Sequence, residues 1–314
     1  MKGKKGHKAK WLVLAAILLS GCSGDDSPNN ANNNNGKDSE IRLNADVWRV
    51  MEGTRTTTYD SQTDIQTEGS FKCTAYDVGT TTVNTTSNVN GSTASWNGST
   101  AWEFAEKHYW PLTGDLDFFA YMPAIKPAYI SDITYAVSGS PAVPRPYFTC
   151  DMRETVEKEF IYALATGQNR TANIAGVNMT FQHPFARIYF QLSSSSGTAV
   201  KINSITISGD DFYKKAKCTF NGTTSTWSEE DNETKGSLGT LAINTPYIVI
   251  PNDYGSSKTI TVNATWDEWS NFSTSVTSSP LTINWVPGYS YTYTFTLSKY
   301  ALKVDVVDKY TEQW

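Results

Sequence analysis

Hydrophobic and polar residues alternate along several short stretches of this chain, as they do in strands with one buried face. The clearest stretch places Ile41, Leu43, Ala45 and Val47 on one side, with three polar residues between them. Residues 116–123 are instead apolar at nearly every position, so we expect a strand that is buried on both faces and stopped by its final proline. These patterns predict a protein built mainly from β-sheets.

Shorter stretches of the same kind recur along the rest of the chain, with turn residues such as Asn221-Gly222 and Pro287-Gly288 between them. We expect strands at residues 71–76, 177–181, 186–192, 200–208, 247–251, 259–266, 281–285, 289–297 and 302–307. Residues 154–165 fit a helix or, from residue 160 onward, a strand, whereas 79–98 suit a loop or hairpin and 124–150 suit irregular structure. Many short strands with turn signals are typical of antiparallel β-sandwiches.

The N-terminus has the layout of a bacterial lipoprotein signal. Five lysines precede a short apolar run at residues 11–19, and small residues lead from there to Cys22. The run is too short to span a bilayer, so we expect residues 1–21 to be a signal peptide that is removed before a lipidated Cys22. An ordinary secretory signal with an incidental Cys22 is the alternative. Residues 22–40 have almost no apolar side chains and are expected to form a lipidated, flexible linker.

Two acidic residues, Asp25 and Asp26, follow the lipidation site closely. They resemble the acidic export signal that sends lipoproteins of Bacteroidetes to the outer face of the outer membrane. A merely polar linker is the alternative interpretation. On the first interpretation the protein is a surface-exposed lipoprotein of the cell outer membrane, tethered through its lipid.

Removal of the signal changes the net charge of the chain. It takes away five of the 26 basic residues and none of the 31 acidic ones, which leaves a net charge of about −10. An acidic chain argues against nucleic acid or anionic lipid as a partner. The remaining length suits two domains, and the polar stretch at 167–176 suggests domain limits of 41–172 and 173–314.

Residues that usually carry catalysis or bind metals are scarce. Cys73, Cys150 and Cys218 form no CxxC pair, and His108 and His183 fall in different predicted domains, so we expect no metal and no cofactor. The three thiols are interpreted as small buried hydrophobic side chains, with a Cys73–Cys150 disulfide as the alternative. We expect His183 to be a structural histidine. No GxSxG motif or phosphate loop occurs, and the acidic runs suit solvated loops, so we do not expect an enzyme.

Two tryptophans, Trp266 and Trp269, flank a pair of acidic residues and are candidates for contact with sugar rings. The simpler interpretation is that Trp266 packs at the end of a strand and Trp269 lies over a loop. If they do bind sugars, the protein would be a glycan-binding surface lipoprotein of an uptake system.

Several features occur in order along the chain: the lipoprotein signal, the first strand closing at Thr54-Arg55, Tyr109-Trp110-Pro111, the apolar segment 116–123, and the segments 179–190 and 285–295. Together they resemble the FimA/Mfa-like fimbrillins of Bacteroidales. The resemblance implies two tandem transthyretin-like antiparallel β-sandwich domains. It also implies a structural or adhesive subunit of a cell-surface fimbria, with other fimbrial subunits and host or bacterial surface ligands as partners.

The resemblance further implies processing by an arginine-specific protease, which in polymerising fimbrillins cuts after the first strand. Arg55 lies among Thr and Gly residues and is the accessible candidate, whereas Arg42 and Arg49 lie within the strand. An ordinary loop arginine without cleavage is the alternative. Losing the first strand would withdraw its four apolar side chains from the core, at a cost of about 5–9 kcal/mol. The vacated groove would then invite a strand from a neighbouring subunit.

A donor strand has to repeat the alternation of the strand that it replaces. Tyr300, Leu302, Val304 and Val306 supply this pattern near the C-terminus, and a final strand of the protein's own sheet explains it equally well. Stalk, anchor and tip subunits differ in cleavage and in strand donation, and the sequence leaves these roles open.

Overall fold

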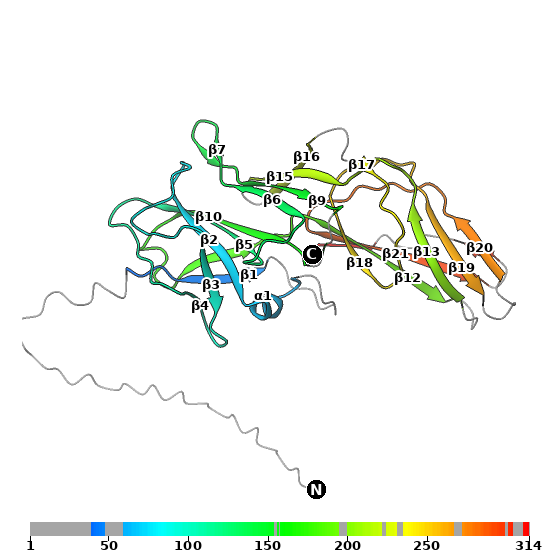
Figure 1. The fold of residues 1–314 in the computed structure, drawn as a ribbon, viewed down its shortest axis with the longest axis horizontal. Coiled ribbons are helices and arrows are strands. Elements are labelled where there is room, and N and C mark those ends of the chain that lie inside the picture. The colour runs from blue at the N-terminus through cyan, green and yellow to red at the C-terminus, as the bar shows by residue number, and fades with distance from the viewer. Residues whose placement is uncertain are drawn as a thin grey trace, which may run out of the picture.

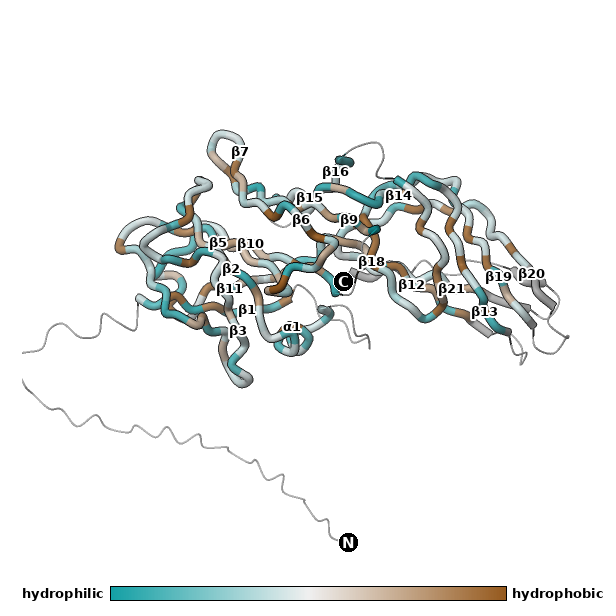
Figure 2. The backbone as a smooth tube through the Cα atoms, viewed as in Figure 1, coloured by the Kyte–Doolittle hydropathy of each residue, from teal (hydrophilic) through white to brown (hydrophobic). Residues whose placement is uncertain are grey.

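The computed structural model describes residues 39–47, 59–153, 156, 158–194, 200–221, 224–230, 235–266, 272–298, 301–303 and 310–313. Nearly all regular structure in these ranges is β-strand, and their only helix is α1 (Gln62–Glu68). The expected all-β fold is therefore confirmed. Figure 1 shows an elongated molecule with β1 to β5 at one end and β13, β19 and β20 at the other. Along most strands, hydrophobic and hydrophilic residues alternate (Figure 2).

The first sheet has seven strands, and its two end strands meet. In spatial order these are β10 (Ile161–Gln168), β5 (Leu116–Met122), β2 (Ser70–Asp77), β3 (Ser92–Trp96), β4 (Trp102–Phe104), β1 (Leu43–Val47) and β11 (Val177–Phe181). Beside the end of β11, the backbones of Tyr162 and Gln182 exchange hydrogen bonds of 3.3 and 2.8 Å. The sheet thus closes on itself at this point, around a core of its own.

Strand β5 separates two hydrophobic cores. Leu116, Phe118 and Ala120 belong to the core inside the first sheet, whereas Phe119 belongs to a second core and Tyr121 packs against it. This arrangement confirms the prediction of a strand buried on both faces that ends before the proline. Apolar residues at nearly every position suit a strand that lies between two cores.

The second core lies under a four-stranded sheet. Its strands are, in order, β16 (Thr224–Glu229), β15 (Lys215–Asn221), β9 (Tyr147–Asp151) and β6 (Ile130–Thr134); β7 (Val137–Ser138) and β8 (Val143–Pro144) form a small hairpin nearby in the chain. Strands β15 and β9 pair directly and come from opposite sides of the predicted boundary between residues 172 and 173. This sheet therefore draws strands from both proposed domains. The predicted domain limits stay a prediction.

The rest of the chain forms a β-sandwich. One sheet contains β18 (Pro246–Val249), β12 (Ala186–Ser194), β21 (Tyr289–Ser298) and β22 (Ala301–Lys303), with β23 (Tyr310–Gln313) also paired to β21. The other contains β13 (Val200–Ile207), β19 (Ile260–Trp266) and β20 (Phe272–Thr277), and β14 (Phe212–Tyr213) pairs with β17 (Lys235–Gly236). Phe190 in β12 and Tyr291 in β21 share one core with Ile205 in β13 and Val262 in β19.

Some sequence-based expectations were wrong. Ile161 begins strand β10, so the helix expected at 154–165 is wrong and the strand alternative is confirmed. Residues 281–285 form no continuous strand. Leu281 and Asn284 make isolated bridges to Lys258 and Asp253, which lie outside the named strands. The stretch 124–150, expected to be irregular, contains strands β6 to β9.

Candidate functional site

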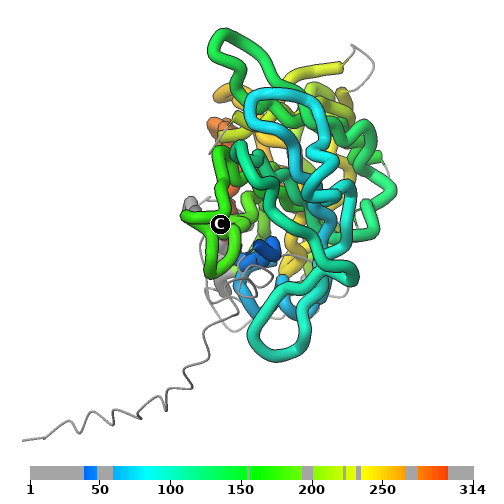
Figure 3. The backbone as a smooth tube through the Cα atoms, turned by 90° about the vertical axis from the view of Figure 1, so that its left-hand side faces the viewer, coloured from blue at the N-terminus to red at the C-terminus, as the bar shows by residue number. Residues whose placement is uncertain are grey.

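Strand β1 occupies an interior position in the first sheet. On one side it runs parallel to β11, from Leu43 opposite Val177 to Val47 opposite Phe181. On the other side Leu43 lies opposite Trp102 of β4, in antiparallel orientation. Figure 3, a view from one end of the molecule, shows the blue β1 segment among cyan and green segments of the sheet. A strand with neighbours on both sides leaves two unpaired edges if it is removed.

The residues just before β1 are also paired. The N–H of Ile41 donates to the carbonyl of His108, and the N–H of Trp110 donates to the carbonyl of Ser39, both at 2.8 Å. His108 itself is buried, and its Nδ1 lies 3.1 Å from the carbonyl oxygen of Ser87. The segment 39–47 is therefore held by backbone pairing along its whole length.

The predicted alternation of the first strand is confirmed by burial. Ile41, Leu43, Ala45 and Val47 are 3, 2, 5 and 3% exposed, and the polar residues between them are exposed. All four buried side chains join the core inside the first sheet. Within that core Phe71 contacts Trp102 and Phe181, with ring centroids 5.0 and 5.3 Å apart, so aromatic rings link the strands that flank β1.

Polar contacts on the outer face fix β1 against the loop before β11. The Asn44 side chain donates to Asn178 Oδ1 at 3.1 Å and to the carbonyl of Ala175 at 3.4 Å. Gly176, with φ of +119°, passes close to it, and a Cβ there would lie 3.1 Å from Asn44 Nδ2. Glycine is favoured here both by its backbone conformation and by this approach.

The chain is anchored again at Tyr59 and Asp60, before α1. Both Asp60 carboxylate oxygens lie 3.0 Å from Nη1 of Arg187 in β12, and Nε of Arg187 donates to Ser290 Oγ in β21 at 3.0 Å. The Tyr59 ring is buried, and burial raises the pKa of its hydroxyl, with the charge of Glu68 adding to the effect. We call Asp60, Arg187 and Ser290 the N-terminal clamp.

Helix α1 follows the clamp and has defined caps. The N–H of Asp64 donates to Ser61 Oγ at 3.2 Å, and Ser61 Oγ donates to the Asp64 carboxylate at 2.7 Å. At the other end Gly69 adopts φ of +80° and donates its N–H to the Ile65 carbonyl. A side-chain N-cap and a left-handed glycine satisfy backbone groups that a short helix leaves unpaired.

The two proposed processing positions, Cys22 and Arg55, lie outside the described residues. Their roles as lipidation site and cleavage site stay predictions. What the structure places is the chain on either side of Arg55: β1 ends at Val47, and the N-terminal clamp begins at Asp60.

The candidate donor segment is only partly placed. Leu302 lies in β22, which pairs with β21 so that Leu302 is opposite Leu297, whereas Tyr300, Val304 and Val306 lie outside the described residues. In this structure β22 is thus a strand of the protein's own sheet. Donation to a neighbour stays a prediction that requires β22 to leave β21.

The candidate sugar-binding residues remain untested. Trp266 is the last residue of β19, opposite Val200 and Phe272 in the neighbouring strands, and Trp269 lies outside the described residues. Sugar contact by these two residues stays a prediction.

His183 is a buried structural residue, as expected. It is 5% exposed, and its Nδ1 lies 2.9 Å from Oε1 of Glu159, which is 0% exposed. Burial raises the pKa of Glu159, and the nearby His183 opposes part of that rise. Sequence reasoning missed Glu159 as the partner, because the two residues lie far apart in the chain.

The three downstream cysteines are free and buried, so the Cys73–Cys150 disulfide is absent and the interpretation as small hydrophobic side chains is confirmed. Cys73 lies in the core of the first sheet, whereas Cys150 and Cys218 lie in the second core. Burial raises the pKa of each thiol. Among the described residues, no group of three or more His, Cys, Asp or Glu side chains is placed to hold a metal ion.

In the ranges that the structure covers, no helix has the length and apolar character needed to cross a membrane.

Comparison with known proteins identifies the family. A solved fimbrial protein from Bacteroides vulgatus aligns with a TM-score of 0.58 and 16% identity, over 88% of this chain and 99% of that protein. A candidate cell adhesion protein from Bacteroides uniformis gives a TM-score of 0.52 and 15% identity, over 88% and 99%. These likenesses concern the fold, and no curated protein matches the chain. A family model described as fimbrillin-like matches residues 54–314, so this chain belongs to the fimbrillin-like family.

Proposed function

We propose that this protein is a subunit of a cell-surface fimbria that is exported as a lipoprotein, modified at Cys22, and joined to other subunits by strand exchange. Membership in the fimbrillin-like family supports the fimbrial role. That family consists of structural subunits, which agrees with the expectation that the chain is not an enzyme. The observation that carries strand exchange is the interior position of β1 between β4 and β11.

Cleavage after Arg55 would free β1 and leave the N-terminal clamp on the retained part of the chain. Tyr59, Asp60 and α1 lie on the far side of the cut, where the N-terminal clamp holds them to β12 and β21. The released segment would take with it the buried face of β1, which is worth about 5–9 kcal/mol of apolar burial. This amount is comparable to the net stability of a domain, so the open groove would require a replacement strand.

The vacated groove would have a defined chemistry. Its edges would be the backbone of β11 at residues 177–181 and the backbone around Trp102 and residues 108–110. Its floor would include Phe71, Trp102 and Phe181. An incoming strand must therefore present alternating apolar side chains and, to match β1, run parallel to β11.

Strand β22 is the proposed donor on the neighbouring subunit. Among the residues that the structure describes, it pairs with β21 through Ala301–Lys303, at the edge of its sheet. An edge strand is bonded to one neighbour, so it gives up fewer hydrogen bonds when it leaves than an interior strand does. Retention of β22 in its own sheet is the alternative, and it would suit a tip or an anchor subunit better than a stalk subunit.

The test replaces the proposed cleavage residue in cells that make fimbriae. Arg55→Ala should keep the N-terminal segment on the protein and abolish the SDS-resistant ladder of polymers on a gel. Arg42→Ala is the matched control, because Arg42 is exposed in the segment that cleavage would remove and its replacement should leave the ladder intact. A normal ladder from Arg55→Ala would contradict cleavage at this residue.

A further inference from the structure

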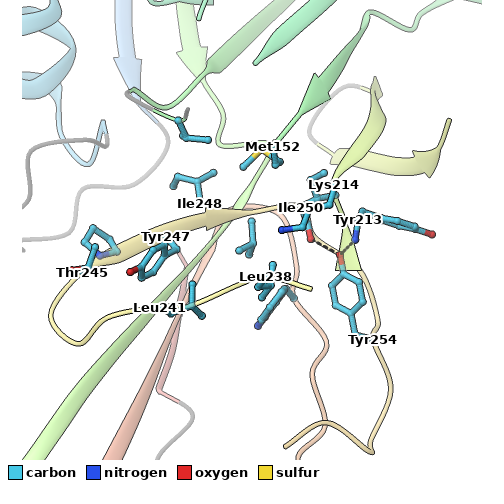
Figure 4. Close-up of a pocket in the computed structure, with 14 residues that line it drawn as sticks. Met152, Tyr213, Lys214, Leu238, Leu241, Thr245, Tyr247, Ile248, Ile250 and Tyr254 are labelled. Atoms are coloured by element: carbon cyan, nitrogen blue, oxygen red, sulfur yellow. Dashed lines mark hydrogen bonds between the residues drawn. The ribbon is translucent and has the colours of Figure 1, made fainter. Parts of the chain in front are cut away.

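A cavity of about 440 Å³ lies beside β18, and no residue of β1 lines it. Its size falls in the range of about 300–1,000 Å³ that is typical of small-molecule sites. Figure 4 shows Met152 and Lys214 on one side, Leu238 and Leu241 on the opposite side, and Tyr247 and Tyr254 at the two ends.

The wall of this cavity is mainly apolar because it lies between two cores. Leu241, Tyr254 and Trp285 belong to the core of the sandwich, and Met152 and Ile248 pack against the core under the four-stranded sheet. Hydrogen bonds within the protein already involve two of the tyrosine hydroxyls. Tyr254 donates to the Ile250 carbonyl at 3.0 Å and accepts from the Tyr213 N–H at 3.3 Å (Figure 4), and Tyr247 accepts from the Ala242 N–H at 2.8 Å.

Lys214 brings a positive charge to this apolar wall. Two nearby lysines are neutralised, Lys235 by Glu229 at 2.9 Å and Lys258 by Asp211, but within the described residues Lys214 has no carboxylate partner. Its stem lies against Gly236 in β17. Burial lowers the pKa of Lys214, which is the direction expected for an ammonium that lacks a nearby anion.

The free edge of β18 adds a second hydrogen-bond donor. β18 is the end strand of its sheet, and Pro246 pairs with Tyr189 although it has no N–H, so this is a non-hydrogen-bonded pair. Alternation along the ladder then makes Tyr247 and Ile188 the hydrogen-bonded pair. The N–H of Ile248 therefore points away from β12, along the edge of β18 that lines the cavity.

We propose that this cavity binds a small amphipathic anion, with an apolar body against Leu238, Leu241 and Met152 and a carboxylate or sulfonate at Lys214. The Ile248 N–H is the second donor to the anionic group. An extended peptide that pairs with β18 is the competing occupant, and it would depend on the backbone of Ile248 more than on the charge of Lys214. The site is independent of the proposed strand exchange, because no residue of the β1 groove lines it.

The test is a titration of the purified mature protein with 8-anilinonaphthalene-1-sulfonate, followed by displacement with decanoate. Saturable binding that decanoate displaces is expected, and Lys214→Met should weaken it about tenfold or more, since a hydrogen bond to a charged group is lost. Leu238→Trp, which fills the cavity from a half-buried position, should abolish it. Lys201→Met is the charge-matched control, because Lys201 is exposed on β13 and does not line the cavity.

Three outcomes would overturn the proposal: no saturable binding, equal affinity for the wild type and Lys214→Met, or binding that survives Leu238→Trp. Displacement of the probe by an apolar pentapeptide but not by decanoate would also overturn it, in favour of strand addition. Circular dichroism of each variant shows that a loss of binding is not a loss of fold.

Discussion

Asp117 is a buried carboxylate near the start of the otherwise apolar strand β5. It is 1% exposed, and it accepts hydrogen bonds from the Gly79 N–H at 3.2 Å, the Tyr135 hydroxyl at 3.0 Å and the Gly167 N–H at 2.9 Å. These donors come from three separate parts of the chain. Asp117 therefore joins the turn after β2, the loop after β6 and strand β10 at one point.

Replacing Asp117 by Ala should lower the free energy of unfolding by about 2 kcal/mol or more, because the buried Tyr135 hydroxyl and two backbone N–H groups lose their shared acceptor. Asp115→Ala is the matched control, since Asp115 is exposed two residues earlier and should change stability by less than about 0.5 kcal/mol. Urea denaturation of both variants measures the difference. Equal midpoints for the two variants would contradict this role of Asp117.

Glu159 should make the stability of the protein depend on pH. Its side chain is fully buried beside His183, its second oxygen has no hydrogen-bond partner, and burial raises its pKa above the ordinary value of 4.5. Between 4.5 and the raised value, the folded state binds more protons than the unfolded state. The free energy of unfolding therefore falls as the pH rises through this window.

Glu159→Gln removes this titration while keeping a polar side chain next to His183. The stability of the wild type relative to Glu159→Gln should fall as the pH rises from 4.5 toward neutrality. Chemical denaturation at a series of pH values gives this difference directly. A difference that is constant, or that grows with pH, would show that Glu159 does not carry a raised pKa.

At the scale of elements, β1 connects the fold to the proposed function. The buried side chains of β1 should stabilise the uncleaved precursor. They should contribute nothing to the stability of an assembled fimbria from which β1 has been removed. Leu43→Ala should destabilise the uncleaved protein by about 2–5 kcal/mol, as large-to-small changes in cores do. Arg42→Ala, one residue away and exposed, should change stability by less than about 0.5 kcal/mol.

The same two variants separate the precursor from the fimbria. Once β1 has been replaced by a donor strand, Leu43→Ala should leave the thermal stability of the purified polymer unchanged. Differential scanning calorimetry of the uncleaved protein and of the polymer makes the comparison. A polymer that the substitution weakens as much as the precursor would mean that β1 stays in place.

Elements with a strong local pattern could be predicted from sequence. β1, β5 and β11 have period-2 or continuous hydrophobicity, and each was expected within a few residues of its observed limits. Helix α1 was missed because a seven-residue helix with one buried side chain, Ile65, has almost no periodicity. The signal that was available is its capping pair, Ser61 with Asp64, followed by Gly69.

Pairing between distant strands is the part that sequence could not supply. β15 alternates buried Ala216, Cys218 and Phe220 with half-buried residues, but its partner β9 lies more than sixty residues earlier. The parallel pairing of β1 with β11, which defines the candidate groove, is equally remote in sequence. Local patterns specify which side of a strand is buried, whereas the choice of neighbour depends on the whole fold.

At the scale of the whole molecule, three hydrophobic cores are linked by strands that contribute to two of them. Strands β5 and β10 contribute to the core of the first sheet and to the second core, and β18 contributes to the second core and to the core of the sandwich. The N-terminal clamp joins residue 60 to β12 and β21 of the sandwich. This connection is what would keep the molecule intact when β1 is removed. Strand exchange with an intact clamp therefore requires that the cut fall after β1 and before Asp60.

The most direct measurement is N-terminal sequencing of the subunit recovered from SDS-resistant polymers on the cell surface. Cleavage after Arg55 predicts a single N-terminus at Thr56, with both Cys22 and β1 absent from the polymer. Polymers in which every subunit still begins at a lipidated Cys22 and retains residues 41–47 would contradict it.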